Sequence, residues 1–296
     1  MTIFSVPHVK QKFNINGDFI MQKKFILGVG AQRTGSSWLH SQIARNPQIH
    51  MGLSKEHHVF NVIFTPYFKK YEQDLRTLVT SSPEETRGYR KKKRLLSFID
   101  DPEHYFNYFE ELCLNNETIE AVADITPAYS MLDHQAYKFI RHGLEKRGFN
   151  VKVVFVMRDP VERVWSMMHQ KGREDANVQG RQIKFKAFTG VDSSMRTRYD
   201  RTIVELEKVF SQDDIFYAFY ETFFNQKSFS ELGEFLTLNL TTPDFDLIKN
   251  KSHMKKPINE PLAIEAANYY AETYEFIANR FGDKVTAIWP GYRHLQ

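Results

Sequence analysis

Short apolar runs alternate with longer segments of helical spacing along this chain. Four runs have the length and composition of buried strands: Phe25–Val29, Glu120–Ala123, Val151–Met157 and Ile215–Tyr220. Short apolar strands that are separated by helices are typical of a parallel sheet covered on both faces. The pattern therefore predicts an α/β fold with a central parallel β-sheet flanked by helices.

The chain shows no internal repeat and no low-complexity linker between these elements. Its 296 residues suit one large α/β domain or two small ones. The simplest interpretation is a single domain over residues 1–296, in which residues 1–24 form an N-terminal extension ahead of the first strand.

The first strand runs into a glycine-rich stretch, FILGVGAQRTGSSW, at residues 25–38. The spacing of Gly30 and Gly35 fits the P-loop pattern G-x-x-x-x-G-K-[ST], but Ser36 stands where that pattern requires lysine. Backbone N–H groups at a strand–loop–helix junction converge on anions, and Arg33 adds a fixed charge. The stretch predicts a P-loop-like site for a phosphate-like anion, with a structural turn as the alternative.

A second candidate site lies in VKVVFVMRDPVERVWSMMHQ, residues 151–170. The strand delivers Arg158 at its carboxyl end, where open α/β sheets bind ligands. Asp159 is suited to cap the following helix and Pro160 to its first turn, and Ser166 falls about two turns into that helix. Arg158 and Ser166 are therefore candidates to bind a second phosphate, and the alternative is a structural arginine beside a surface serine.

Composition limits the classes of partner and compartment. Forty Lys and Arg against thirty-six Asp and Glu give a net charge of +4, which is too mild to indicate nucleic acid. Cys113 is the only cysteine, so no intrachain disulfide can form, and we expect a small buried residue in a reducing compartment. The start of the chain lacks a continuous apolar h-region, and no window approaches the roughly 20 apolar residues of a transmembrane segment. These features predict a cytoplasmic protein.

One basic run stands out at residues 90–94, RKKKR. Such a run is most often the solvated face of a helix. The second interpretation is a rim that contacts an anion.

Four motifs together resemble one enzyme family. GAQRTGSSWL and VMRDPVERVWSMM are similar to the two nucleotide signatures of the sulfotransferases that use 3′-phosphoadenosine 5′-phosphosulfate (PAPS), the first to their 5′-phosphosulfate loop and the second to their 3′-phosphate motif. SKEHHVFN, residues 54–61, resembles the K-E-x-H-F-F-D stretch of the glucosaminyl 3-O-sulfotransferases. DITPAY, residues 124–129, resembles their [DE]-K-T-P-x-Y loop. The resemblance is greatest to the heparan sulfate/carbohydrate branch and its bacterial relatives.

The resemblance implies a PAPS sulfotransferase fold and a role for each motif residue. Glu56 would take the proton of the acceptor, and His58 would orient Glu56 or contact the acceptor. Arg33 would stabilise the departing phosphate, because arginine stays charged and does not donate a proton. PAPS would be the co-substrate, 3′-phosphoadenosine 5′-phosphate (PAP) the product, and no metal would be required. The implied nucleotide-binding residues are Arg33, Thr34, Gly35, Ser36, Ser37, Trp38, Arg158, Ser166, Lys255 and Lys256, the last two standing in for a late glycine-rich loop that this chain lacks.

The acceptor is less well defined by these motifs. By resemblance it is a hydroxyl or amine of a saccharide or glycan, with a lipid or small metabolite as the alternative. Ile125 replaces a lysine and Asn61 an aspartate of the family pattern, which puts the acceptor contacts in doubt. A carboxylate base must have a raised pKa or act on a strongly polarised hydroxyl. Glu56 is alternatively a surface carboxylate paired with Lys55, and His57 is a rival base.

Two other functions stay open on the sequence. A nucleotide kinase would use Asp124, at the end of the apolar run EAVAD, to bind Mg²⁺, although the P-loop lysine is missing. A non-catalytic nucleotide-binding protein is the third possibility, but it would not need a positioned base such as the one in SKEHH. Oligomeric state cannot be derived from the sequence.

Overall fold

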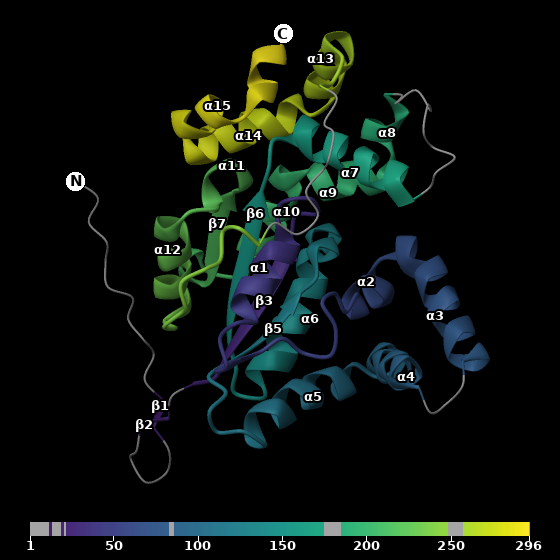
Figure 1. Ribbon diagram of the computed structural model, residues 1–296, viewed down its shortest axis with the longest axis vertical. Coiled ribbons are helices and arrows are strands. Elements are labelled where there is room, and N and C mark those ends of the chain that lie inside the picture. The colour runs from purple at the N-terminus through teal and green to yellow at the C-terminus, as the bar shows by residue number, and fades with distance from the viewer. Residues whose placement is uncertain are drawn as a thin grey trace.

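A five-stranded parallel sheet forms the centre of the molecule (Figure 1). The computed structural model describes residues 12–13, 19–20, 22–82, 86–174, 185–247 and 257–295. In the sheet, β3 (Lys24–Gly30) lies between β5 (Ala121–Ile125) and β6 (Asn150–Met157), and β4 (Ile49–His50) and β7 (Ile215–Phe219) form the edges. The predicted α/β architecture is confirmed.

The four predicted strands are β3, β5, β6 and β7, each within two residues of its expected bounds. The edge strand β4 was not predicted, because two residues give no apolar run to recognise. Ahead of β3, the expected N-terminal extension is described only at residues 22 and 23 and in a small antiparallel pair, β1 (Lys12–Phe13) with β2 (Phe19–Ile20).

Fifteen α-helices occur in the described residues. They are α1 (Ser36–Ile43), α2 (Val59–Phe64), α3 (Lys69–Ser81), α4 (Arg87–Asp100), α5 (Pro102–Leu114), α6 (His134–Glu145), α7 (Pro160–Glu174), α8 (Lys186–Thr189), α9 (Val191–Thr197), α10 (Tyr199–Glu207), α11 (Tyr220–Phe223), α12 (Gln226–Leu236), α13 (Glu260–Tyr269), α14 (Ala271–Phe281) and α15 (Asp283–Ile288).

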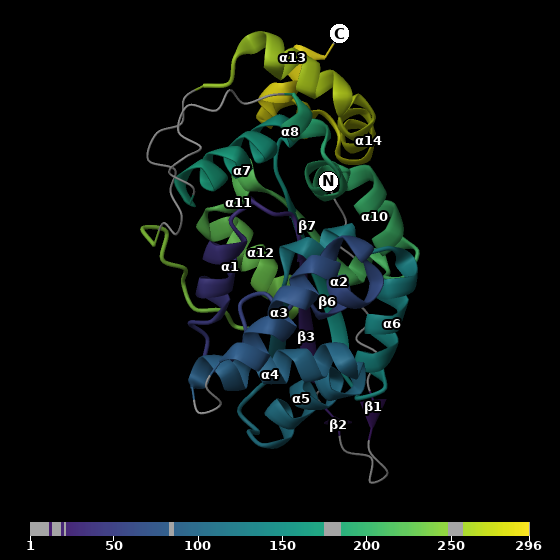
Figure 2. The same ribbon diagram turned by 90° about the vertical axis from the view of Figure 1, so that its right-hand side faces the viewer.

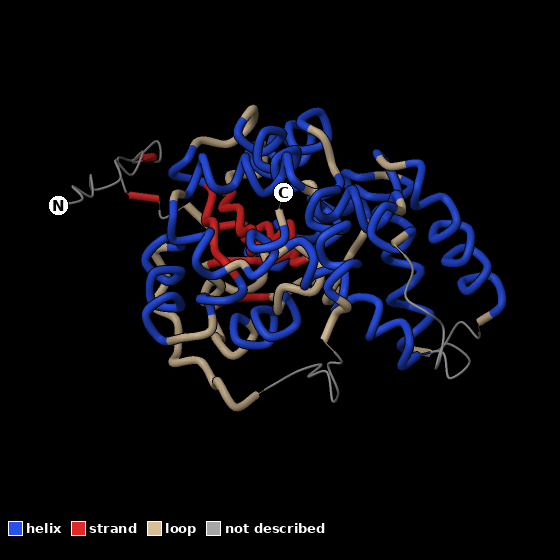
Figure 3. Tube along the Cα trace, turned by 90° about the horizontal axis from the view of Figure 1, so that it is seen from above, coloured by secondary structure: helices blue, strands red, loops and turns tan. Residues whose placement is uncertain are grey.

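The sheet is buried on both faces because its side chains alternate between two cores. Phe25 and Leu27 of β3 pack into the larger core with α2, α5, α6 and α7, whereas Ile26 packs into a second core with α1 and α12. Figure 3 shows the strands enclosed by helices. Both faces therefore need apolar side chains, which explains the continuous apolar runs in the sequence.

The helices α2, α3 and α4 extend from one side of the sheet (Figure 1), and they lie in front of it where that side faces the viewer (Figure 2). They follow β4 in the chain, and Glu56 lies in the loop that leads from β4 into α2. Cys113 of α5 is buried, and burial raises the pKa of its thiol to about 11, as expected for a small core residue. Within the described residues, the helices are all too short or too polar to cross a membrane.

Candidate active site

The loop between β3 and α1 has the backbone conformation of a tight anion-binding turn. Arg33 and Gly35 both have positive φ, at 70° and 81°. A Cβ atom on Gly35 would lie only 2.3 Å from the ring of Phe224, so no other residue fits at this position. The N–H groups of the first turn of α1 begin directly after Gly35, as the sequence predicts for a site that holds a phosphate.

Arg33 links this loop to the second predicted motif. Its Nε donates to Ser166 Oγ at 3.3 Å and its Nη1 to Gln170 Oε1 at 2.8 Å, both on α7. In return, Arg158 Nη1 donates to the Arg33 carbonyl at 3.3 Å. The two segments, which are more than 120 residues apart, therefore form one continuous site at the carboxyl ends of β3 and β6.

Arg158 is a buried cation, only 4% exposed, at the start of α7. Its guanidinium lies over the ring of Tyr220, 4.4 Å from the centroid, and Nη2 donates to Glu162 at 3.2 Å. Within the described part of the chain, its buried Nε has no hydrogen-bond partner. Because a buried charged donor rarely stays unpaired, the guanidinium has spare capacity for an anion.

The start of α7 is fixed as the sequence predicts. Asp159 Oδ1 accepts from the N–H of Glu162 at 3.0 Å, which caps the helix, and Pro160 is its first residue. Asp159 Oδ2 also accepts from the N–H of Gly291 at 2.7 Å. The C-terminal segment therefore holds the residue next to Arg158 in place.

The other residues predicted to bind the nucleotide differ in how far their side chains are accessible to a ligand. The Thr34 hydroxyl donates to Ala31 O at 2.6 Å and is buried, so it stabilises the loop and does not face a ligand. Ser36 and Ser37 are half-buried in the first turn of α1. The Trp38 ring is core, stacked on Phe245, and its Nε1 donates to Asp244 O. Lys255 and Lys256 lie outside the described residues.

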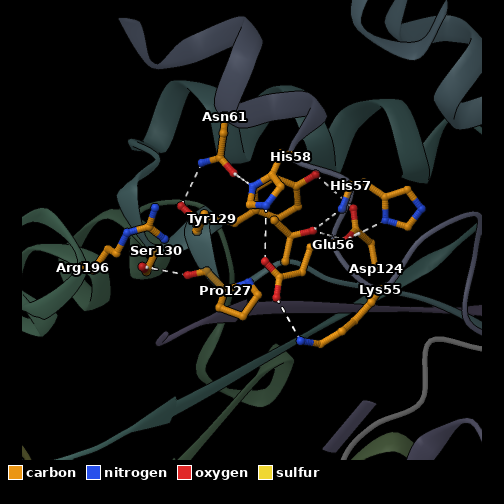
Figure 4. Close-up of polar contacts among 12 residues, drawn as sticks. Lys55, Glu56, His57, His58, Asn61, Asp124, Pro127, Tyr129, Ser130 and Arg196 are labelled. Carbon is orange, nitrogen blue, oxygen red and sulfur yellow. Dashed lines mark hydrogen bonds and ion pairs between the residues drawn. The ribbon is translucent and has the colours of Figure 1, made fainter. Parts of the chain in front are cut away.

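Glu56 lies in the loop between β4 and α2, between Lys55 and His58. Lys55 Nζ is 3.1 Å from Oε1, and His58 Nε2 is 3.3 Å from Oε2 (Figure 4). Burial raises the pKa of this carboxyl, but the hydrogen bond from His58 and the charge of Lys55 outweigh it and hold the pKa below the ordinary value. Of the two expectations for a carboxylate base, a raised pKa is therefore wrong for this arrangement, and action on a polarised hydroxyl remains.

Asn61 holds the imidazole of His58 in place. Asn61 Nδ2 donates to Ala128 O at 2.8 Å, so its Oδ1 faces His58 Nδ1, at 3.3 Å. The other ring nitrogen, Nε2, lies toward Glu56. Asn61, which stands where the motif has an aspartate, contacts the imidazole without a negative charge. Figure 4 shows the row from Lys55 through Glu56 and His58 to Asn61.

His57 points away from Glu56 into the protein and is fully buried. Its Nε2 accepts from the N–H of Leu53 at 3.2 Å, and its Nδ1 lies 3.1 Å from Asp124 Oδ1. The ring is therefore enclosed between Leu53 and Asp124, and a buried ring cannot reach an acceptor. The rival assignment of His57 as the base is wrong for this structure.

Asp124 is also fully buried, and donors surround its carboxylate. Tyr105 and Tyr129 donate to Oδ2 at 2.8 and 3.0 Å, and Thr126 donates to Oδ1 at 2.6 Å. Burial raises the pKa of the carboxyl, but its interactions with His57 and with these hydroxyl donors outweigh burial, so the pKa lies below the ordinary value. A carboxylate held in this way is not available to Mg²⁺, which argues against the kinase interpretation of EAVAD.

Thr126 connects the Glu56 loop to the donor loop. The N–H of His57 donates to Thr126 Oγ1 at 2.8 Å, and the N–H of Thr126 donates to Gly28 O of β3 at 2.9 Å. The side chain of Ile125, which stands where the motif has a lysine, is buried against Gly28. The Glu56 loop is therefore anchored where the strands have their carboxyl ends, on the same side of the sheet as the phosphate loop.

Two residues of the site were not predicted. Gln170 follows Ser166 by four residues, so one helical turn places both on the same face, and this spacing could have indicated it. Tyr220 directly follows β7, at the carboxyl end of an edge strand, and its contact with Arg158 gives no signal in the sequence.

Comparison with known proteins agrees with this geometry. Residues 23–272 match the sulfotransferase domain family. The fold is similar to that of a sulfotransferase from Alicyclobacillus acidocaldarius, with a TM-score of 0.59 at 16% identity over 88% of this chain and 97% of that one. A sulfotransferase domain from the curacin biosynthetic pathway gives a TM-score of 0.47 at 14% identity, over 88% and 98% of the two chains. A search of curated proteins gives no match. Since the family match spans most of the sequence, this chain belongs to the sulfotransferase domain family.

Proposed function

We propose that this protein transfers a sulfuryl group from PAPS to a hydroxyl or amine of an acceptor, in the manner of the carbohydrate branch of the family. The observation that carries the proposal is the direct contact between the two anion-binding segments. Arg158 and Ser166, which suit a 3′-phosphate, are joined through Arg33 to the loop that suits a 5′-phosphosulfate. The unpartnered Nε of buried Arg158 fits a doubly charged phosphate at that end.

The residues of the Glu56 loop supply the base. Glu56 accepts the acceptor proton while the acceptor oxygen forms its bond to sulfur and the bond from sulfur to the bridging phosphate oxygen breaks. Arg33 and the first N–H groups of α1 stabilise the negative charge that remains on the 5′-phosphate of PAP. His58 orients Glu56 and is held by Asn61. Lys55, next to Glu56, favours the ionised carboxylate.

Nucleotide selectivity tests the donor half of this proposal. We expect calorimetric titration to give tight binding of PAP that does not depend on Mg²⁺, and weak binding of ATP. Arg158→Ala should weaken PAP about 30-fold, as expected when a charged hydrogen-bonding group is lost. The same variant should bind adenosine 5′-phosphosulfate, which lacks the 3′-phosphate, as well as the native protein does. Binding of Mg·ATP alone would exclude the proposal and favour a kinase.

The acceptor class of this proposal is a saccharide hydroxyl. It follows from the likeness of SKEHHVFN and DITPAY to glucosaminyl sulfotransferase motifs, and it is supported by the shared positions of Glu56 and His58. The replacements at Asn61 and Ile125 weaken it, because both remove a charge that the family places beside the acceptor.

A further inference from the structure

A cavity of about 440 Å³ opens between α3 and α4, next to the loop that carries Glu56. Its walls are largely apolar: Leu75 and Leu95 are buried at its base, and Leu78 is 44% exposed at its edge. Large aliphatic side chains exposed beside a cavity of this size are typical of a ligand site.

Tyr71 connects this cavity to the proposed base. It lines the cavity, and its ring lies 5.2 Å from the ring of His58, which bonds to Glu56. Burial raises the pKa of the Tyr71 hydroxyl, and the nearby charge of Glu56 raises it further. Ser54, two residues before Glu56, lines the same cavity. A ligand in the cavity would therefore end beside the Glu56–His58 pair.

The charge at the mouth of the cavity is positive. Lys91 and Lys92 of the basic run line it, and neither forms an ion pair within the described part of the chain. Asp74 also lines it, but both of its carboxylate oxygens lie 3.0 Å from Lys70 Nζ. The uncompensated charge favours an anionic group on the occupant.

We infer that the sulfate acceptor is an amphipathic molecule whose apolar chain or ring lies between α3 and α4, whose anionic group meets Lys91 and Lys92, and whose hydroxyl reaches Glu56. This rests on the proposed function and narrows its acceptor: a glycan acceptor would carry an apolar chain, and a small free sugar would leave the cavity empty. A hydroxylated fatty acid and an acidic glycolipid share this chemistry.

Gly88 offers a way to fill the cavity without disturbing the core. It lines the cavity from the first turn of α4, and no atom lies within 4 Å of a Cβ built on it. Gly88→Phe should occupy the space that the chain of the acceptor needs, and Gly88→Ala is the matched control. Both substitutions leave Arg158, Arg33 and Glu56 unchanged, so PAP affinity reports separately on the donor site and on folding.

The probes are ω-hydroxydodecanoate, dodecanediol, dodecyl glucoside and methyl glucoside, each titrated below its micellar concentration in the presence of PAP. We expect the three chain-bearing probes to bind and methyl glucoside not to bind. Gly88→Phe should weaken the bound probes at least tenfold and Gly88→Ala less than twofold. Lys91→Ala with Lys92→Ala should weaken ω-hydroxydodecanoate but not dodecanediol. With PAPS, mass spectrometry of the products then tells the two sources apart, since either the hydroxy acid or the glucoside is sulfated.

Two results would overturn the inference. One is binding of methyl glucoside as tight as that of dodecyl glucoside, which would mean that the chain contributes nothing. The other is failure of all chain-bearing probes to bind, or binding that Gly88→Phe leaves unchanged, while PAP still binds normally. Loss of PAP binding in the native protein would instead contradict the proposed function itself.

Discussion

The two halves of the site are held together in different ways. On the donor side, Arg33 contacts both Arg158 and Ser166 directly, where two adjacent central strands end. On the acceptor side, Glu56 and His58 lie on a loop that follows a two-residue edge strand and is anchored by a buried network through His57 and Asp124.

The donor side binds a group of constant shape, whereas the acceptor side binds a group that varies between enzymes. A phosphate has the same shape in every nucleotide, so a loop, a helix N-terminus and an arginine suffice to bind it. An acceptor differs from one enzyme to the next, and the proposed acceptor site lies at α2, α3 and α4, which stand outside the sheet (Figure 1). Helices of this kind can change without disturbing the strands that position the phosphate loop.

The largest effect should come from the acceptor side. Glu56→Gln removes the proposed base but keeps the shape, so we expect kcat to fall about a thousandfold while PAP affinity stays the same. The measurement is turnover of the acceptor identified by product mass spectrometry. Glu72→Gln, at a half-buried carboxylate of α3 that pairs with Arg76, is the control and should retain full activity. Full turnover by Glu56→Gln would exclude it as the base.

The pH dependence of kcat in the native enzyme tests the same assignment of Glu56 as the base. Because the pKa of Glu56 lies below its ordinary value, the carboxylate is ionised throughout the neutral range. We expect the acid limb of the kcat profile to fall only below about pH 4, since an unperturbed glutamate titrates near 4.3. An acid limb near pH 6 or 7 would point to a different base.

The next largest effect should be a loss of stability when the buried network around Asp124, which anchors the Glu56 loop, is disrupted. Asp124→Asn leaves His57 and three hydroxyl donors without their buried charge, and we expect a loss of about 3 kcal/mol in the free energy of unfolding. Urea denaturation measures it. Asp100→Asn, an exposed residue that pairs with Arg76, should cost less than about 1 kcal/mol.

The sign of the pH effect follows from the lowered pKa of Asp124. A carboxyl whose pKa is lower in the folded state contributes stability above its unfolded pKa of about 3.9 and loses it as the pH falls through the folded pKa. The difference between the native protein and Asp124→Asn should therefore be constant from about pH 8 to pH 5 and shrink below about pH 4. A difference that grows toward low pH would mean that Asp124 is buried in its neutral form.

The donor side was largely predictable because its residues are local in sequence. Gly35, Arg158 and Ser166 each stand at a fixed distance from the end of an apolar strand, and the parallel sheet brings those ends together. On the acceptor side, the sequence predicted which motifs are present but not how their residues are arranged. That His57 turns inward to Asp124, and that Tyr71 lines a cavity and contacts His58, depends on tertiary packing between helices whose apolar spacing shows only that they are buried.

The smallest effect should come from Arg33→Lys, which tests how the donor side stabilises its leaving group. Lysine keeps the charge but cannot contact both Ser166 and Gln170 as the guanidinium does, so two hydrogen bonds are reduced to one. Each is worth about 1 kcal/mol, and we expect kcat to fall less than about tenfold. The measurement is kcat against pH between about pH 6 and pH 11, which spans the ordinary lysine pKa of about 10.4; below that pKa, a residue that only stabilises charge gives parallel profiles for both proteins. A higher kcat for Arg33→Lys, declining as the lysine loses its proton, would show that the leaving phosphate needs a proton donor. Parallel profiles would show that a fixed positive charge, held against α7 by Ser166 and Gln170, is sufficient.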